Sequence, residues 1–360
     1  MSLSIGIVGL PNVGKSTLFN ALTNNNILAA NYPFATIEPN TGVVPVPDAR
    51  LDELANVYGS KKILPATVDF TDIAGLVAGA SKGEGLGNQF LSHIRECAAI
   101  VQVVRDFSDT NVIHVDNELH PSKDIDVINT ELVLADLQTL DKILPRVEKE
   151  ARADAKKKPL AEALAKAHAL LDDGTPIYSD ESLRATIADF KELQLLTAKP
   201  IIYLFNVDEA TLTDKNKQAE LTALVAPSRA LFVNAKLEDE LRSLDEADRA
   251  EMLKEYGATE SGLIQLIHAA YETLGLQSYL TAGPQEVRAW TIKKNATAPQ
   301  AAGVIHGDFE RGFIAADVVS FADLVAAGSL SAARAAGKVR TEGKTYTMQP
   351  DDVVEFKFNV

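Results

Sequence analysis

The chain has 360 residues, of which 46% are hydrophobic and 24% charged, as in a globular protein long enough for more than one domain. Its formal net charge of −15 argues against a surface coated with basic side chains, so we expect no DNA partner. No apolar run approaches the ~18 residues that a membrane-spanning helix needs, so we expect no membrane partner either.

The first predicted element is a short apolar strand at residues 5–9, which leads through a glycine-bounded loop into a helix beginning at Lys15. Gly9, Gly14, Lys15 and Ser16 occupy the fixed positions of G-x-x-x-x-G-K-[ST], the phosphate-binding P-loop. The glycines let backbone N–H groups turn toward an anion, and the start of the helix adds partial positive charge. Lys15 then reaches the outer phosphates, and the Ser16 hydroxyl is placed to bind Mg²⁺. This stretch predicts nucleotide binding, and it begins too near the N-terminus for a signal peptide.

The segment 31–41 follows, and Pro33 and Pro39 make it irregular. A threonine in such a loop can close over the nucleotide and give its hydroxyl to Mg²⁺ once the last phosphate is present. We predict that Thr36 does this, with Thr41 as the alternative. A loop threonine is more often a local backbone cap, so this interpretation depends on the P-loop before it.

Residues 66–72 form a predicted strand that ends in a D-x-x-G sequence, made by Asp72 and Gly75, about 55 residues after the P-loop. We expect Asp72 to meet Mg²⁺ through water and the Gly75 N–H to meet the γ-phosphate. The next residue, Leu76, stands where Ras-like GTPases have a glutamine that orients the attacking water. Because leucine cannot hydrogen-bond, hydrolysis should be slow or should use another group.

Several groups could orient this water in place of a glutamine. We predict His114 for this role, and the alternatives are His93, a backbone group or a monovalent cation held by Asn12. A single histidine is more often structural than catalytic, so the sequence alone leaves the choice open.

The glycine-rich segment 79–90 is predicted to be a switch loop whose conformation follows the γ-phosphate. It does not match the dinucleotide-binding pattern G-x-G-x-x-G, because Asn88 stands where the third glycine would be. Cys97, the only cysteine, is predicted to be a small buried residue. A single cysteine excludes an intramolecular disulfide and a cysteine-based zinc site, and it fits a cytoplasmic location. A buried strand at residues 100–104 follows.

From about residue 122 to 197 the chain changes to long, charged stretches in which apolar residues recur at helical spacing. The first two of these runs are separated by a break at residues 156–159. We interpret residues 122–197 as a helical hairpin that projects from the nucleotide-binding domain. Helices that pack flat on one core would give the same periodicity, so that alternative stays open.

A predicted strand at residues 201–205 leads into Asn206-Val207-Asp208-Glu209, where a GTPase places N-K-x-D. In that motif the aspartate accepts both guanine N1–H and N2–H₂, but Glu209 is one methylene too long for this geometry and Val207 replaces the lysine. A site built for guanine donors loses affinity when they are unmatched, so the departure favours adenine. The sequence Asn234-Ala235-Lys236 resembles the S-A-K element of GTPases, however, and keeps guanine as an alternative.

After an amphipathic helix predicted at residues 261–275, the last segment has a pattern of its own. Residues 287–292 and 353–358 are predicted strands, residues 321–327 a short helix, and glycines punctuate the stretches between them. No grouping of His, Asp, Ser or Cys there suggests catalysis. We interpret this segment as a small mixed α/β binding module. Residues 281–360 are neutral overall, so any RNA contact is least repelled there.

Taken together, these motifs closely resemble the YchF, or Obg-like ATPase, family. The resemblance spans essentially the full length, and the combination of N-x-x-E with this C-terminal segment is specific. Obg proper shares the switch loop but keeps a guanine-reading motif, so it is the less close relative. The stretches that carry the resemblance are residues 9–16, 72–75, 83–90, 206–209, 282–291 and 298–306.

The resemblance implies an α/β fold. A P-loop NTPase domain of the G-protein-like, or OBG, type would comprise residues 1–121 and 198–277. An α-helical coiled-coil arm at residues 122–197 would interrupt it, and a C-terminal TGS domain, a β-grasp module, would occupy residues 278–360.

The resemblance also implies slow Mg²⁺-dependent ATP hydrolysis, activation by K⁺, and association with the ribosome or ribosomal RNA through the TGS domain and the arm. Asn206 and Val207 would lie against the base, and Ser16 and Thr36 would bind Mg²⁺. The phosphates would be held by Asn12, Val13, Gly14, Lys15, Ser16 and Thr17.

We therefore predict an ATP-binding, slowly hydrolysing switch whose output is ribosome binding. An ATPase whose turnover is itself the output is one alternative, and a GTPase of the Obg kind is another. Leu76 favours the switch, because an enzyme selected for turnover would be expected to keep a water-orienting group.

Overall fold

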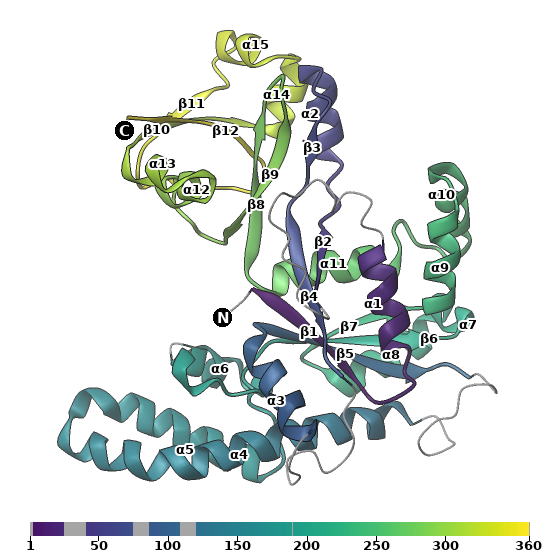
Figure 1. The fold of residues 1–360 in the computed structure, drawn as a ribbon, viewed down its shortest axis with the longest axis vertical. Helices are drawn as coiled ribbons and strands as arrows, with labels where there is room; N and C mark the ends of the chain where they lie inside the picture. The colour runs from purple at the N-terminus through teal and green to yellow at the C-terminus, as the bar shows by residue number, and fades with distance from the viewer. Residues whose placement is uncertain (1–2, 25–40, 75–85, 109–119, 189, 360) are drawn as a thin grey trace. The chain divides into compact units, whose positions relative to one another are not determined.

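The computed structural model describes residues 3–24, 41–74, 86–108, 120–188 and 190–359. The chain forms two compact units, one made of residues 1–44 and 69–266 and the other of residues 45–68 and 267–360 (Figure 1). No helix within the described ranges combines the length and the apolar character needed to cross a lipid bilayer.

The first unit is built on a six-stranded sheet with the order β2-β4-β1-β5-β6-β7. Strand β1 pairs in parallel with β4 and β5, and β5 with β6 and β6 with β7 are also parallel. All residues of β1 and β6 are buried, as in a parallel sheet covered on both faces. The carboxyl ends of these parallel strands share one edge, where ligands bind in open α/β sheets. The strands are β1 (Ser4–Gly9), β2 (Thr41–Pro45), β4 (Thr67–Asp72), β5 (Ala99–Asp106), β6 (Ile201–Val207) and β7 (Arg229–Val233).

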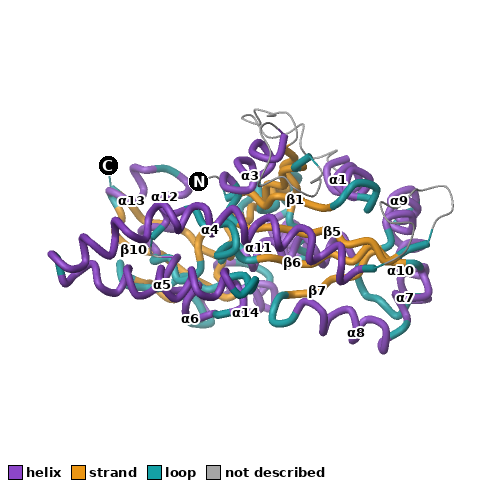
Figure 2. The backbone as a smooth tube through the Cα atoms, turned by 90° about the horizontal axis from the view of Figure 1, so that it is seen from below, coloured by secondary structure: helices purple, strands orange, loops and turns teal. Residues whose placement is uncertain are grey.

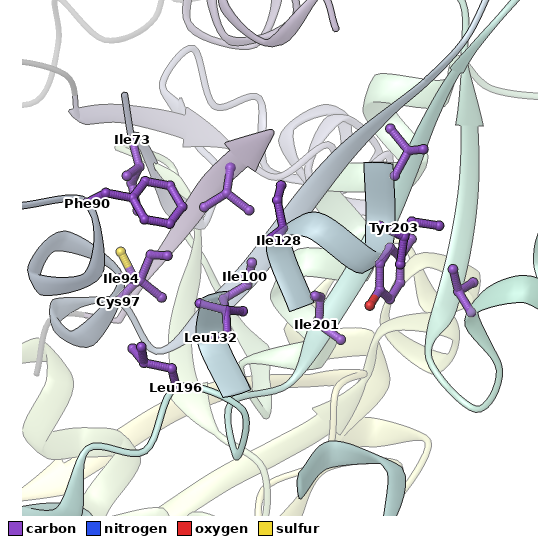
Figure 3. Packing of buried hydrophobic residues seen from close by; sticks show 14 of the residues in the cluster. Ile73, Phe90, Ile94, Cys97, Ile100, Ile128, Leu132, Leu196, Ile201 and Tyr203 are labelled. Carbon is purple, nitrogen blue, oxygen red and sulfur yellow. The ribbon is translucent and has the colours of Figure 1, made fainter. Parts of the chain in front are cut away.

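Helices α3, α4 and α8 pack against one face of this sheet through a cluster of buried side chains that includes Ile94, Ile128 and Tyr203 (Figure 3). Cys97 belongs to the same cluster, which confirms the predicted buried cysteine, and burial raises the pKa of its thiol. The helices of this unit are α1 (Lys15–Asn24), α3 (Leu86–Glu96), α4 (Pro121–Ala153), α5 (Lys158–Asp172), α6 (Glu181–Ala188), α7 (Glu209–Thr213), α8 (Lys215–Val225), α9 (Ala235–Ser243), α10 (Glu246–Glu255) and α11 (Gly262–Thr273), the last of which runs into the second unit; short 3₁₀ turns lie at Ala155–Lys157, Ile177–Ser179 and Lys191–Leu193.

Helix α4 contributes to two separate cores. Its first half packs on the sheet through Ile128 and Leu132, and its second half, with Leu140 and Val147, packs against α5 and α6. Figures 1 and 2 both show α4 and α5 side by side (Figure 2). In Figure 1 the pair extends away from the strands of the sheet. The structure therefore contains the predicted helical hairpin, while the flat packing considered as an alternative describes only the first half of α4.

A buried carboxylate fixes α4 to the segment that precedes β6. The side chain of Asp136 accepts hydrogen bonds from the backbone N–H of Leu196 at 2.8 Å and of Thr197 at 2.8 Å, and from the Thr197 hydroxyl at 2.7 Å. Burial raises the pKa of Asp136 to about 6, although these three donors oppose the shift.

The second unit contains a mixed sheet with the order β11-β10-β12-β8-β9-β3. Strands β8 and β9 form an antiparallel hairpin, and β12 is parallel to β8 and antiparallel to β10. Helix α12 covers this sheet through its alanines, and Tyr279 donates a hydrogen bond to the Ala301 carbonyl at 2.9 Å. A hairpin, a covering helix and a last strand parallel to the first make the predicted β-grasp arrangement. The elements are α2 (Arg50–Tyr58), β3 (Ile63–Leu64), β8 (Leu276–Ala282), β9 (Val287–Lys293), α12 (Ala298–Ile305), α13 (Gly307–Arg311), β10 (Phe313–Ser320), α14 (Phe321–Ala327), α15 (Leu330–Ala335), β11 (Arg340–Glu342) and β12 (Asp352–Phe358).

Two stretches differ from the sequence analysis. Residues 45–68, assigned there to the nucleotide-binding domain, pack in the second unit, because β3 pairs with β9 and Arg50 bonds the Asp351 carboxylate at 2.8 Å. The predicted limits describe functional domains, and a division into compact units does not test them. They therefore stay a prediction. Residues 86–90 are the first turn of α3 and not part of a loop, because the 3.6-residue spacing of Phe90, Leu91 and Ile94 buries one helical face.

Candidate functional site

The loop that joins β1 to α1 has the backbone of a phosphate-binding turn. Strand β1 ends at Gly9, Asn12 and Gly14 have φ angles of +64° and +89°, and α1 begins at Lys15. A Cβ at Gly9 would lie 2.9 Å from a Val13 methyl and 3.0 Å from the Val103 carbonyl oxygen, so only glycine fits this turn. The loop therefore delivers successive backbone N–H groups and a helix N-terminus to one point.

Lys15 and Asp72 form an ion pair beside this loop. Asp72 is the last residue of β4, which lies next to β1 with Ile7 opposite Asp72, and its Oδ1 accepts a hydrogen bond from the Lys15 ammonium. Lys15 is buried, and a buried charge is tolerated when it is paired and hydrogen-bonded. The structure thus brings together two of the predicted catalytic residues.

The same corner offers oxygen ligands for a metal ion. Ser16 and Thr17 are exposed on the first turn of α1 and follow Lys15, which pairs with the carboxylate that ends β4. Hydroxyl and carboxylate oxygens are the ligands that Mg²⁺ prefers, so Ser16 and Asp72 fit this ion.

Asn206, near the end of β6, connects the P-loop to the first residue of α9. Its Nδ2 donates to the Val13 carbonyl at 3.1 Å, and its Oδ1 accepts from the Ala235 N–H at 3.1 Å. A Cβ at Gly14 would overlap the Asn206 Nδ2. Both ends of the buried Asn206 amide therefore bond to the backbone. The sequence analysis predicts that Asn206 lies against the base, and these two backbone bonds are the contacts that the structure gives it.

A cleft of about 1010 Å³ opens beside the P-loop, large enough for a small-molecule ligand. The ends of four parallel strands meet around it. It is lined by Asn12, Gly14 and Thr17 of the P-loop, by Phe107 and Ser108 after β5, by residues 206–210 at the end of β6 and the start of α7, and by residues 234–236, Asp239 and Glu240, which follow β7.

Val207 contributes to this cleft only through its backbone. Its side chain has no exposed surface and packs in the core, while its carbonyl accepts a hydrogen bond from the Asn234 Nδ2 at 2.7 Å. The Asn234 Oδ1 accepts from the Leu237 N–H at 2.9 Å and so caps α9. Asn234, the first residue of the element that resembles S-A-K, thus caps α9 and also bonds the last residue of β6.

The two acidic residues after Val207 bond other segments. Asp208 Oδ2 accepts from the Ser108 N–H at 3.2 Å and from the Ser108 hydroxyl at 3.3 Å. Glu209, the first residue of α7, accepts a hydrogen bond from the Tyr256 hydroxyl at 3.0 Å. Tyr256 was missed by the sequence analysis, because it belongs to no motif and lies 47 residues from its partner.

Thr36, Gly75 and His114 are outside the described residues, as is Leu76. Thr41, the alternative Mg²⁺ ligand, begins β2 with its hydroxyl 3.4 Å from that of Thr71. His93, an alternative for orienting water, is exposed in the last turn of α3 and does not line the cleft.

Comparison with known proteins matches both ends of the chain. Residues 4–166 match a family described as 50S ribosome-binding GTPase, and residues 276–359 match YchF-GTPase_C, described as a protein of unknown function. The chain is 50% identical to the Ribosome-binding ATPase YchF of Bacillus subtilis over 366 residues, which covers both proteins completely. The chain belongs to the YchF family. The protein of that name from Escherichia coli O157:H7 is 48% identical, again over the full length of both chains.

Solved structures confirm the YchF fold. A structure described as the Schizosaccharomyces pombe YchF GTPase has a TM-score of 0.86 and 39% identity, covering 99% of this chain and 97% of that one. A GTP binding protein from Pyrococcus horikoshii, at 21% identity and a TM-score of 0.61, shares the fold. YchF relatives are thus named both ATPase and GTPase, so their names alone do not decide which base fits the cleft.

Proposed function

We propose that the chain binds ATP with Mg²⁺ in this cleft, hydrolyses it slowly and acts as a nucleotide-gated switch that associates with the ribosome. The observation that carries the nucleotide part is the position of Lys15, at the first residue of α1 and against Asp72 at the end of the neighbouring strand. ATP and the ribosome are supported by the name that the relatives from Bacillus subtilis and Escherichia coli share, Ribosome-binding ATPase YchF.

The proposed reaction would use the P-loop and the carboxylate that ends β4. Lys15 would donate to the outer phosphates, and the backbone N–H groups of residues 12–17 would surround them. Ser16, and Asp72 through water, would hold Mg²⁺, which would supply positive charge against the phosphates. Donors fixed before the reaction stabilise the charge that develops as water attacks the γ-phosphate, because they need no reorganisation at that moment.

The remaining predicted roles belong to the same proposal. Thr36 would be a Mg²⁺ ligand that is released with the γ-phosphate, and Gly75 would meet that phosphate through its N–H. His114 would orient the attacking water, with a K⁺ ion held near Asn12 as the alternative activator. Loss of the γ-phosphate would change the conformation of the switch segments and so the affinity for the ribosome.

The helical arm and the C-terminal unit are the proposed contact surfaces for ribosomal RNA. At the end of the α4–α5 hairpin, Arg152, Lys156 and Lys158 are exposed, although the chain as a whole carries a net charge of −15. Basic side chains in this position would attract phosphates. The functional domains would be residues 1–121 with 198–277, residues 122–197 and residues 278–360, and the protein would act in the cytoplasm.

The test measures ATP binding and ATP turnover by the full chain, with and without ribosomes. We expect slow turnover in isolation, and Lys15→Ala should weaken ATP binding by roughly 100-fold, because a charge-assisted contact to phosphate is lost. Lys62→Ala is the matched control, because Lys62 pairs with Glu286 in the other unit at 2.8 Å and should not affect ATP. Fast turnover without ribosomes would contradict the switch, and absence of ATP binding would contradict the whole proposal.

A second candidate, GTP binding, is favoured by one observation. Asn234, Ala235 and Lys236 line the same cleft in the order of the S-A-K element of GTPases. A competition titration of ATP against GTP, with Mg²⁺ and K⁺ present, separates the two. A clear preference for GTP would move the chain toward the Obg GTPases and leave the phosphate site unchanged.

A further inference from the structure

Tyr256 is held beside Glu209 by a small core of its own. It follows the last residue of α10, and it packs against the apolar cluster formed by Leu237, Leu241 and Leu253 of α9 and α10. Leu212 of α7 packs against the same cluster, and α7 begins with Glu209. The phenol ring is therefore fixed relative to the helix that carries the carboxylate.

The direction of the hydrogen bond between the two residues is determined by their chemistry. A carboxylate only accepts, so the Tyr256 hydroxyl donates to Glu209 Oε2, at 3.0 Å. This hydrogen bond is also the main reason that the pKa of Tyr256 is raised. One of the two carboxylate oxygens is thus oriented toward Tyr256 before any ligand arrives.

The consequence depends on what each base presents. Guanine offers two adjacent donors, N1–H and N2–H₂, and a carboxylate must present both oxygens to accept them together. Adenine offers a single donor group on that edge, its N6 amino group, next to the acceptor N1. The bond from Tyr256 turns Oε2 of Glu209 toward the tyrosine, so presenting both oxygens side by side to guanine requires that this bond break or be shared, whereas Oε1 alone can accept the single donor of adenine.

We propose that Tyr256 is a specificity-determining positioning residue, which holds Oε2 of Glu209 and so leaves this carboxylate suited to adenine and poorly suited to guanine. The inference rests on the proposed function, since it requires that a nucleotide base occupy the cleft lined by Glu209. Tyr256 acts through Glu209 and need not touch the base.

The test is the ratio of ATP to GTP affinity, measured by equilibrium titration of the full chain with each Mg²⁺ nucleotide. Tyr256→Phe removes the donor and keeps the ring in its apolar contacts. We expect the ATP:GTP affinity ratio to fall about fivefold, as for the loss or gain of one hydrogen bond. Tyr58→Phe, the same chemical change in α2 of the other unit, should leave the ratio unaltered.

A second variant checks that Tyr256 works through Glu209. Glu209→Asp withdraws the carboxylate by one methylene from the tyrosine, so it should lower the ratio by itself. The double variant should lower it no further, because both changes break the same hydrogen bond. If Tyr256→Phe does not fold, as judged by thermal unfolding, an unchanged ratio in Glu209→Asp is enough to overturn the proposal.

The outcomes separate this inference from the proposed function. Equal weakening of both nucleotides by Tyr256→Phe would mean that the tyrosine only supports the fold, and this would overturn the inference, as would an unchanged ratio. A wild-type chain that binds neither nucleotide would instead overturn the proposed function itself.

Discussion

On its P-loop side, the proposed phosphate end, the cleft presents backbone groups with one ion pair beside the loop, whereas on the other side, the proposed base end, it presents side chains that bond one another. Gly9 and Gly14 shape the first within one continuous stretch. The second brings Asp208 to Ser108, Asn234 to the strand β6, and Glu209 to a distant tyrosine. A phosphate site can thus be encoded locally, while the proposed base site depends on separate segments of the chain that must come together.

Asn206 connects these two ends, and its removal should have the largest effect. Asn206→Ala would leave the buried Val13 carbonyl and the Ala235 N–H without their partner. We expect the free energy of unfolding to fall by about 3 kcal/mol, since each unpaired buried group costs roughly 1–3 kcal/mol. ATP affinity should fall with it, because the P-loop loses its support. Urea unfolding and ATP titration measure the two effects.

Two further variants help to interpret the result for Asn206→Ala. Asn206→Asp keeps an acceptor for the Ala235 N–H, but it buries a charge and turns an oxygen toward the Val13 carbonyl, so it should destabilise the fold at least as much as Asn206→Ala. Asn216→Ala, at an exposed position on the first turn of α8, is the matched control and should change little. If Asn206→Ala kept both its stability and its ATP affinity, the two ends of the cleft would be independent of each other.

The same contrast explains which features could be predicted from the sequence. The P-loop and Asp72 follow from consecutive residues whose spacing is fixed by phosphate chemistry, and the structure places Lys15 against Asp72. The arm follows from helical periodicity. Periodicity does not name the partner of a helix, however, so it could not show that Ile128 of α4 serves the sheet while Leu140 serves the hairpin.

Contacts between distant segments leave no local pattern. Strand β3 has only two residues, and its pairing with Val287 of β9 joins positions more than two hundred residues apart. The hydrogen bond from Tyr256 to Glu209 is of the same kind. The cap formed by Asn234 could have been found, because an asparagine that directly precedes a helix is a common N-cap. Its second bond, to Val207, could not.

A smaller effect on stability is expected at Asp136, which attaches α4 to the segment just before β6. Its carboxylate bonds Leu196 and Thr197, just before β6, and burial raises its pKa from 3.8 to about 6. Between these pH values the folded chain binds a proton that the unfolded chain does not. This contribution to stability is therefore full below pH 3.8 and is lost as the pH rises through about 6. Relative to Asp136→Asn, the free energy of unfolding should fall by on the order of 2 kcal/mol across this range.

The measurement is urea unfolding of both proteins at several pH values between about 4 and 7. Asp136→Asn should be less stable than wild type throughout, because its amide N–H₂ would face backbone donors. The informative quantity is the difference between the two proteins, since other groups titrate in both. A difference that stays constant with pH would mean that burial of Asp136 is not linked to protonation, and that the attachment of β6 is insensitive to pH.

Ser108 should give the smallest effect, because its bond lies at the exposed rim of the base end. Its hydroxyl donates to Asp208 Oδ2 at 3.3 Å, and its backbone N–H donates to the same oxygen at 3.2 Å. Ser108→Ala removes only the hydroxyl, and water can replace it, so we expect a loss of less than about 0.5 kcal/mol in unfolding free energy and about a twofold change in ATP affinity at most. Asp208→Ala, which removes both bonds, is the matched comparison in the same titrations. A loss in Ser108→Ala as large as that in Asn206→Ala would show that exposed contacts fix the base end as firmly as the buried amide does, and the distinction between the two would fail.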